Sequence, residues 1–71
     1  MVSAEIVAEL VRKTITRTET LLGKGCVSWE DAKNGVRKIL LHLTAQYPEH
    51  ALFIREELEG WIDEQDKRRS N

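Results

Sequence analysis

The sequence predicts an all-α fold, a small three-helix bundle in an up-down-up arrangement. Apolar residues recur at helical spacing in three segments, and no stretch alternates between apolar and polar residues as a half-buried strand would. The two breaks between the segments are short, and short links favour antiparallel neighbours. We therefore expect helices at about residues 3–22, 29–46 and 48–67 in one domain spanning 1–71, with 68–71 as a frayed tail.

The first helix is expected to begin at Ser3 and to end before Gly23 and Gly25. A serine side chain can cap the free N–H groups at a helix start, and glycine favours the end. At about 100° per residue its apolar sector covers roughly 200°, which is wider than one neighbouring helix requires. The sector contains Ala4, Ile6, Val7, Leu10, Val11, Thr14, Ile15, Thr18, Leu21 and Leu22.

The second helix is expected to begin after Ser28, with Glu30 and Asp31 in its first turn, where carboxylates are favourable. Gly35 lies at the edge of its apolar seam and would permit close approach of a neighbouring helix. Leu41 lies about 140° from the centre of the seam, so it is an apolar residue outside the expected core face. The seam itself contains Trp29, Ala32, Val36, Ile39, Leu40, Leu43 and Tyr47.

Pro48 separates the second helix from the third, because proline disfavours helical geometry in the preceding residue and suits the first helical position. The third helix has an apolar stripe, and half of its other positions are acidic. The stripe contains Ala51, Ile54, Leu58, Trp61, Ile62 and the stem of Gln65. The acidic residues opposite the stripe are Glu49, Glu56, Glu57, Glu59, Asp63 and Glu64, and Asp66 follows near the end of the segment.

An up-down-up arrangement predicts which residues meet at each end of the bundle. The first helix ends, the second begins and the third ends at one pole, where Leu22, Trp29 and Trp61 should cluster. At the opposite pole we expect Ile6, Val7, Tyr47 and Ile54.

Length and cysteine content limit the class of protein. A chain of 71 residues is near the size at which one core is barely sufficient, so we predict completion by a homodimer. Cys26 is the only cysteine, which excludes an intramolecular disulfide and favours a reducing, cytoplasmic setting. We expect no secretory signal and no membrane-spanning segment.

Charge is distributed unevenly along the chain. Residues 1–47 carry seven basic and five acidic side chains, whereas residues 48–66 carry one basic and seven acidic. Lys67, Arg68 and Arg69 then add three positive charges. This pattern suits a charged protein partner better than a nucleic-acid backbone.

The sequence offers no set of residues for catalysis or metal binding. Residues 23–26, with two glycines and a lysine, lack the length and the strand context of a phosphate loop and fit a helix cap and turn. Cys26 has no base placed beside it. His42 and His50 are eight residues apart across a proline, unlike helical metal ligands. We predict no enzymatic activity, no cofactor and no metal.

The preferred hypothesis is a protein–protein interaction module that docks on a protein partner, self-associates, or does both. A wide apolar sector and apolar residues outside the core favour this interpretation. The expected contacts are Leu41, Leu52 and Phe53, with Glu56 and Glu57 as flanking charges. In general type the chain resembles many small bacterial or phage accessory proteins, a likeness that assigns no residue.

The alternative is a small DNA-binding transcriptional regulator with a helix-turn-helix-like unit. The acidic start of the second helix, at Glu30 and Asp31, and the acidic third helix argue against it. Its nucleic-acid contacts would be Arg12, Lys13, Arg17, Lys33, Arg37 and Lys38.

Overall fold

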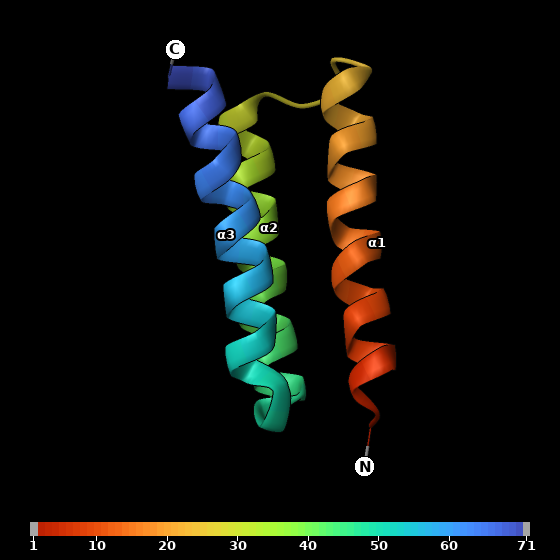
Figure 1. Cartoon of the computed structure of the whole chain (residues 1–71). Coiled ribbons are helices and arrows are strands. Elements are labelled where there is room, and N and C mark those ends of the chain that lie inside the picture. The colour runs from red at the N-terminus through yellow and green to blue at the C-terminus, as the bar shows by residue number, and fades with distance from the viewer. Residues whose placement is uncertain (1, 71) are drawn as a thin grey trace.

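The computed structural model describes residues 2–70, and it is an up-down-up bundle of three long helices (Figure 1). Helix α1 spans Ala4–Gly23, α2 spans Trp29–Gln46 and α3 spans Ala51–Ser70. A single 3₁₀ turn, η1, covers Pro48–His50. The end of α1, the start of α2 and the end of α3 lie at one pole, so the predicted fold class and topology are confirmed.

The helix boundaries follow from their capping groups. The Ser3 hydroxyl accepts a hydrogen bond from the Ile6 N–H at 3.3 Å, and the Ser28 hydroxyl accepts one from the Asp31 N–H at 3.1 Å. Helix α1 ends at Gly23, and the chain then turns at Gly25, whose φ of 72° is readily adopted only by glycine. The Cys26 N–H then donates to the Leu21 carbonyl, which closes the turn expected after a glycine cap.

The third helix starts and ends differently from the prediction. Pro48 opens the 3₁₀ turn η1, and regular α-helix begins only at Ala51. The helix then runs to Ser70, three residues beyond the expected end at Lys67, so residues 68–70 of the predicted frayed tail are helical. The Ser70 hydroxyl donates to the Asp66 carbonyl at 2.8 Å, which supports this last turn. Residue 71 lies outside the described residues.

The hydrophobic core lies along the axis between the three helices and uses most of the predicted positions. Its buried members are Val7, Val11, Val36, Leu40, Leu43, Ile54, Leu58 and Ile62. Partly buried apolar residues pack against them, namely Val2, Leu10, Ile15, Trp29, Tyr47 and Trp61. The tryptophan pair at the pole is confirmed, because the Trp29 and Trp61 rings meet edge to face at 5.7 Å between centroids.

Two large apolar residues that were predicted in the core are exposed. Ile6 is 54% exposed, and Ile39 is 39% exposed. Helix α1 stands to one side of the closely packed α2 and α3 (Figure 1), and its apolar sector is wider than the surface that these helices cover. The edges of that sector, where Ile6 lies, therefore stay exposed to solvent. The residues of α2 that face one of these edges, such as Ile39, are exposed as well. Within residues 2–70, no helix combines the length and apolar character needed to cross a membrane.

Candidate functional site

The predicted partner contacts are exposed, but they do not form one surface. Leu41 on α2 is 70% exposed, and Leu52 on α3 is 68% exposed. Phe53 is 39% exposed and follows Leu52 in α3, so the two side chains point about 100° apart. Leu41 lies on the side of α2 opposite its buried seam. The structure therefore separates Leu41 from Phe53.

Phe53 and Glu57 line an open groove between α1 and α3, which we call the α1/α3 groove. The other lining residues, Ala8, Val11, Arg12 and Ile15, come from α1. Its volume is about 410 Å³. Two of the five predicted contacts thus share a groove with Val11 and Ile15, which were expected in the core, and with Arg12, which was a predicted nucleic-acid contact. Leu41, Leu52 and Glu56 do not line it.

A second groove, of about 480 Å³, runs between α1 and α2 and has a mostly apolar lining. We call it the α1/α2 groove. Its lining residues are Leu10, Lys13, Thr14, Arg17, Thr18 and Leu21 of α1, Val27 of the link, and Asp31, Ala32, Gly35, Val36 and Ile39 of α2. This groove was not predicted as a site. The two signals that could have indicated it were the wide apolar sector of α1 and a glycine at the edge of the α2 seam.

Gly35 has no close neighbour in this groove. A Cβ atom added to it would meet nothing within 4 Å. The close approach of a helix that this glycine was expected to permit therefore does not occur within the described chain.

Two cations border the α1/α2 groove. Lys13 and Arg17 lie one turn apart on α1, and neither forms an ion pair within residues 2–70. Glu9, four residues before Lys13, forms its ion pair with Arg12. Asp31 lies on the opposite wall, in the first turn of α2. The groove thus combines an apolar floor with a positively charged wall.

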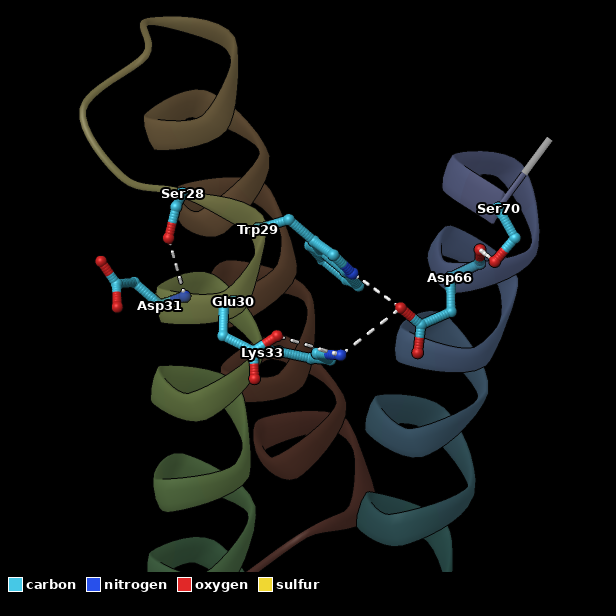
Figure 2. Close-up of polar contacts among 7 residues, drawn as sticks. All are labelled: Ser28, Trp29, Glu30, Asp31, Lys33, Asp66 and Ser70. Carbon is cyan, nitrogen blue, oxygen red and sulfur yellow. Dashed lines mark hydrogen bonds and ion pairs between the residues drawn. The ribbon is translucent and has the colours of Figure 1, made fainter.

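A polar cluster joins α2 to α3 at the pole where the two tryptophans meet (Figure 2). The Trp29 indole N–H donates to Asp66 Oδ1 at 2.6 Å. The Lys33 ammonium lies 3.6 Å from the same oxygen and 3.5 Å from Glu30. On α3, the Arg69 guanidinium lies 4.7 Å from the centroid of the Trp29 ring, within the range of a cation–π contact. The cluster holds the start of α2 against the end of α3.

The environment of Asp66 favours its ionised form. The hydrogen bond from Trp29 is the main cause that lowers the pKa of Asp66 below its ordinary 3.8, and desolvation acts in the opposite direction. The positive charges of Lys33 and Arg37 add to the lowering. A carboxylate bound by its own chain in this way fits a structural link, and its Oδ1 atom is engaged by both Trp29 and Lys33.

The residues considered for catalysis or metal binding are scattered. Cys26 and His42 are exposed. A ring nitrogen of His50 lies 3.1 Å from the Val2 carbonyl, which ties the N-terminal segment to the start of α3. Within residues 2–70, no three His, Cys, Asp or Glu side chains gather closely enough to hold a metal ion.

The six cations of the DNA-binding alternative are divided between helices and surroundings. Arg12, Lys13 and Arg17 share the outer face of α1. Lys33 is engaged by Glu30 and Asp66, and Arg37 borders a hollow with Glu59 and Asp63 of α3. Lys38 is exposed on α2. Only the three cations of α1 are brought together.

Comparisons of the chain with protein families, with curated proteins and with solved structures find no match.

Proposed function

We propose that this chain is a non-enzymatic protein–protein interaction module. The observation that carries the proposal is the apolar surface left open along both sides of α1, in the α1/α2 and α1/α3 grooves. Burial of apolar surface is the main favourable term in most protein association, so an open apolar groove gains free energy when a partner covers it. Isolated exposed leucines are ordinary, whereas contiguous apolar surface marks interaction sites.

The size of the chain supports the same proposal. A domain of 71 residues buries a smaller fraction of its surface than a larger one does, and it is correspondingly marginal. Because Ile6 and Ile39 are exposed, the chain buries less apolar area on folding than its apolar residues would allow. A partner that covers these side chains would recover that stabilisation.

Capture of proteins from a cell lysate on the immobilised chain, followed by mass spectrometry, tests the proposal. We expect wild type to retain a protein that Phe53→Asp loses, because a carboxylate in the α1/α3 groove would oppose burial. Leu41→Asp tests the predicted contact on the back of α2. Asn34→Asp is the matched control, since it adds the same charge at another exposed position of α2. If Phe53→Asp and Leu41→Asp retain every protein that wild type retains, the predicted contacts are wrong.

Self-association is a second form of the same proposal. The homodimer predicted from chain size would bury one of the open grooves against a second copy. Light scattering over a wide concentration range measures the mass directly. A dimer would support this form, and a monomer at every concentration would contradict it.

DNA binding is the alternative, and the grouping of Arg12, Lys13 and Arg17 on α1 is the observation in its favour. The pairing of Arg12 with Glu9, and of Lys33 with Glu30 and Asp66, reduces the charge available to phosphates. A gel-shift titration at low and moderate salt tests it. DNA binding requires an affinity that falls steeply with salt, and no binding at low salt would exclude it.

A further inference from the structure

The α1/α2 groove has the features of a site for a helix from another protein. Both helices contribute apolar side chains to its floor: α1 supplies Leu10 and Leu21, and α2 supplies Val36 and Ile39. Helix-in-groove recognition uses such a floor to receive apolar side chains at helical spacing. Ile39 is 39% exposed there, so the groove is open to an incoming side chain.

Gly35 adds a geometric reason to expect a docked helix in the α1/α2 groove. Glycine in the interior of a helix is destabilising relative to alanine, and nothing within the described chain would obstruct a Cβ at this position. The absence of a side chain leaves the wall of α2 flat beside Ile39, one turn along the helix. A flat wall allows the backbone of a docked helix to approach more closely than a larger residue would.

The charges select the kind of helix. Lys13 and Arg17 lie one turn apart on the α1 wall, at its border with the outer face of that helix, and neither forms an ion pair within residues 2–70. Acidic residues spaced three or four apart on a docked helix would lie opposite them. Asp31 lies on the other wall near the link, so a basic residue at that end of the docked helix would set its direction.

We propose that the α1/α2 groove binds one amphipathic helix of a protein partner, with acidic residues beside its apolar stripe. The proposal rests on the proposed interaction function and adds the surface and the chemistry of the partner. A second copy is a poorer occupant, because the same groove on it would bring a second Lys13 and Arg17 toward these cations. The chain's own α3 is not available as the occupant, because its apolar stripe is already buried against α1 and α2.

A designed peptide tests the charge requirement. The probe is a fluorescein-labelled helix of about five turns, with leucines three and four residues apart and glutamates beside them. A matched peptide carries lysine at each glutamate position. Fluorescence anisotropy should show saturable binding of the acidic peptide and binding weaker by roughly tenfold or more for the lysine peptide. No saturable binding of the acidic peptide up to about 1 mM would overturn the proposal.

Two glycine variants test the location. Gly35→Leu would fill the groove, whereas Gly60→Leu places the same side chain on α3, outside it, where a Cβ also meets nothing within 4 Å. Gly35→Leu should weaken binding by roughly tenfold or more, and Gly60→Leu should leave it unchanged. Circular dichroism and thermal unfolding establish that both variants are folded. Equal binding by folded Gly35→Leu and wild type would overturn the proposal.

A charge-reversal variant tests the cationic wall. The double variant Lys13→Glu with Arg17→Glu should invert the preference, so that it binds the lysine peptide better than the acidic one. Arg55→Glu, which reverses one exposed cation on α3, is the control and should keep the wild-type preference. An unchanged preference in the double variant would overturn the assignment of these two cations.

The lysate capture separates this proposal from the function on which it rests. If Gly35→Leu loses the captured protein and Gly60→Leu keeps it, the groove is the binding surface. If Phe53→Asp loses the protein and Gly35→Leu keeps it, the groove proposal fails and the interaction function stands. If wild type retains no protein specifically, the interaction function itself fails.

Discussion

Asp66 is the residue through which the two most closely packed helices are joined at one pole. It accepts a hydrogen bond from the Trp29 indole at 2.6 Å and lies 3.6 Å from the Lys33 ammonium (Figure 2). An exposed ion pair by itself contributes little to stability. Here the same carboxylate also fixes the orientation of an aromatic ring that packs on the core, and a charged acceptor strengthens the hydrogen bond.

The lowered pKa of Asp66 makes this contribution depend on pH. Because the folded-state pKa lies below the ordinary 3.8, Asp66 stabilises the fold above that pH, and its contribution is lost as the pH falls through the folded-state value. In Asp66→Asn, urea unfolding at neutral pH should show lower stability than wild type, and the loss of stability between neutral and acidic pH should be smaller.

Asp63→Asn, one turn earlier in α3, serves as the control for this comparison, because its carboxylate forms no ion pair within residues 2–70. The stability of Asp63→Asn at neutral pH, and its loss of stability at acidic pH, should be closer to the wild-type values than those of Asp66→Asn. If Asp66→Asn loses as much stability between neutral and acidic pH as wild type does, Asp66 does not contribute to the pH dependence of folding.

The helices depend on local signals at their ends, and these signals were readable from the chain. Ser3, Ser28 and Gly25 occupy the capping positions that their residue types favour. Pro48 marks the start of the third helical segment, although its first turn is 3₁₀. The position at which α3 ends could not be predicted from local signals, because Arg69 in its last turn contacts Trp29, a residue forty positions earlier in the chain.

Removal of the α2 cap tests how much such a signal contributes. Ser28→Ala leaves the Asp31 N–H without its side-chain acceptor, and we expect it to lower the free energy of unfolding by about 1 kcal/mol. Ser70→Ala is the control, because its hydroxyl only donates to a carbonyl in the last turn of α3, and its effect should stay within about 0.5 kcal/mol. Chemical denaturation measures both. Equal effects would contradict the capping role.

Helix α1 shows where reasoning from the sequence reached its limit. Its wide apolar sector was correctly recognised, and its central residues Val7 and Val11 are buried. Periodicity gives the direction of each side chain about one axis, but it does not give the distance or tilt of the neighbouring helices. Ile6 and Ile39 were therefore placed in the core, although both lie at edges that the packing leaves open.

The molecule as a whole depends on a small core, and the free energy of unfolding should reflect which leucines belong to it. Leu58 is fully buried, whereas Leu52 on the same helix is 68% exposed. Leu58→Ala should lower the free energy of unfolding by about 2–5 kcal/mol, and Leu52→Ala by less than about 0.5 kcal/mol. Thermal and urea unfolding compare the two. Similar losses would contradict this arrangement of the core.

The fold class and the order of the helices follow from local patterns, but the candidate site does not. The exposed predicted contacts, Leu41 and Leu52, were identified by their position outside an apolar stripe. The grooves arise only when two helices are placed side by side, and much of their apolar lining, such as Val11 and Val36, consists of residues that the patterns assign to the core. Likewise, the contact of His50 with Val2 joins residues 48 positions apart and has no local signal.

The most direct test of the interaction function is a nuclear magnetic resonance titration of the ¹⁵N-labelled chain with the purified protein that it captures. If the open apolar surface along α1 is the binding surface, the largest amide shifts should fall on residues that line the α1/α2 and α1/α3 grooves. Shifts confined to faces without a groove, with the groove amides unchanged at saturation, would contradict that account.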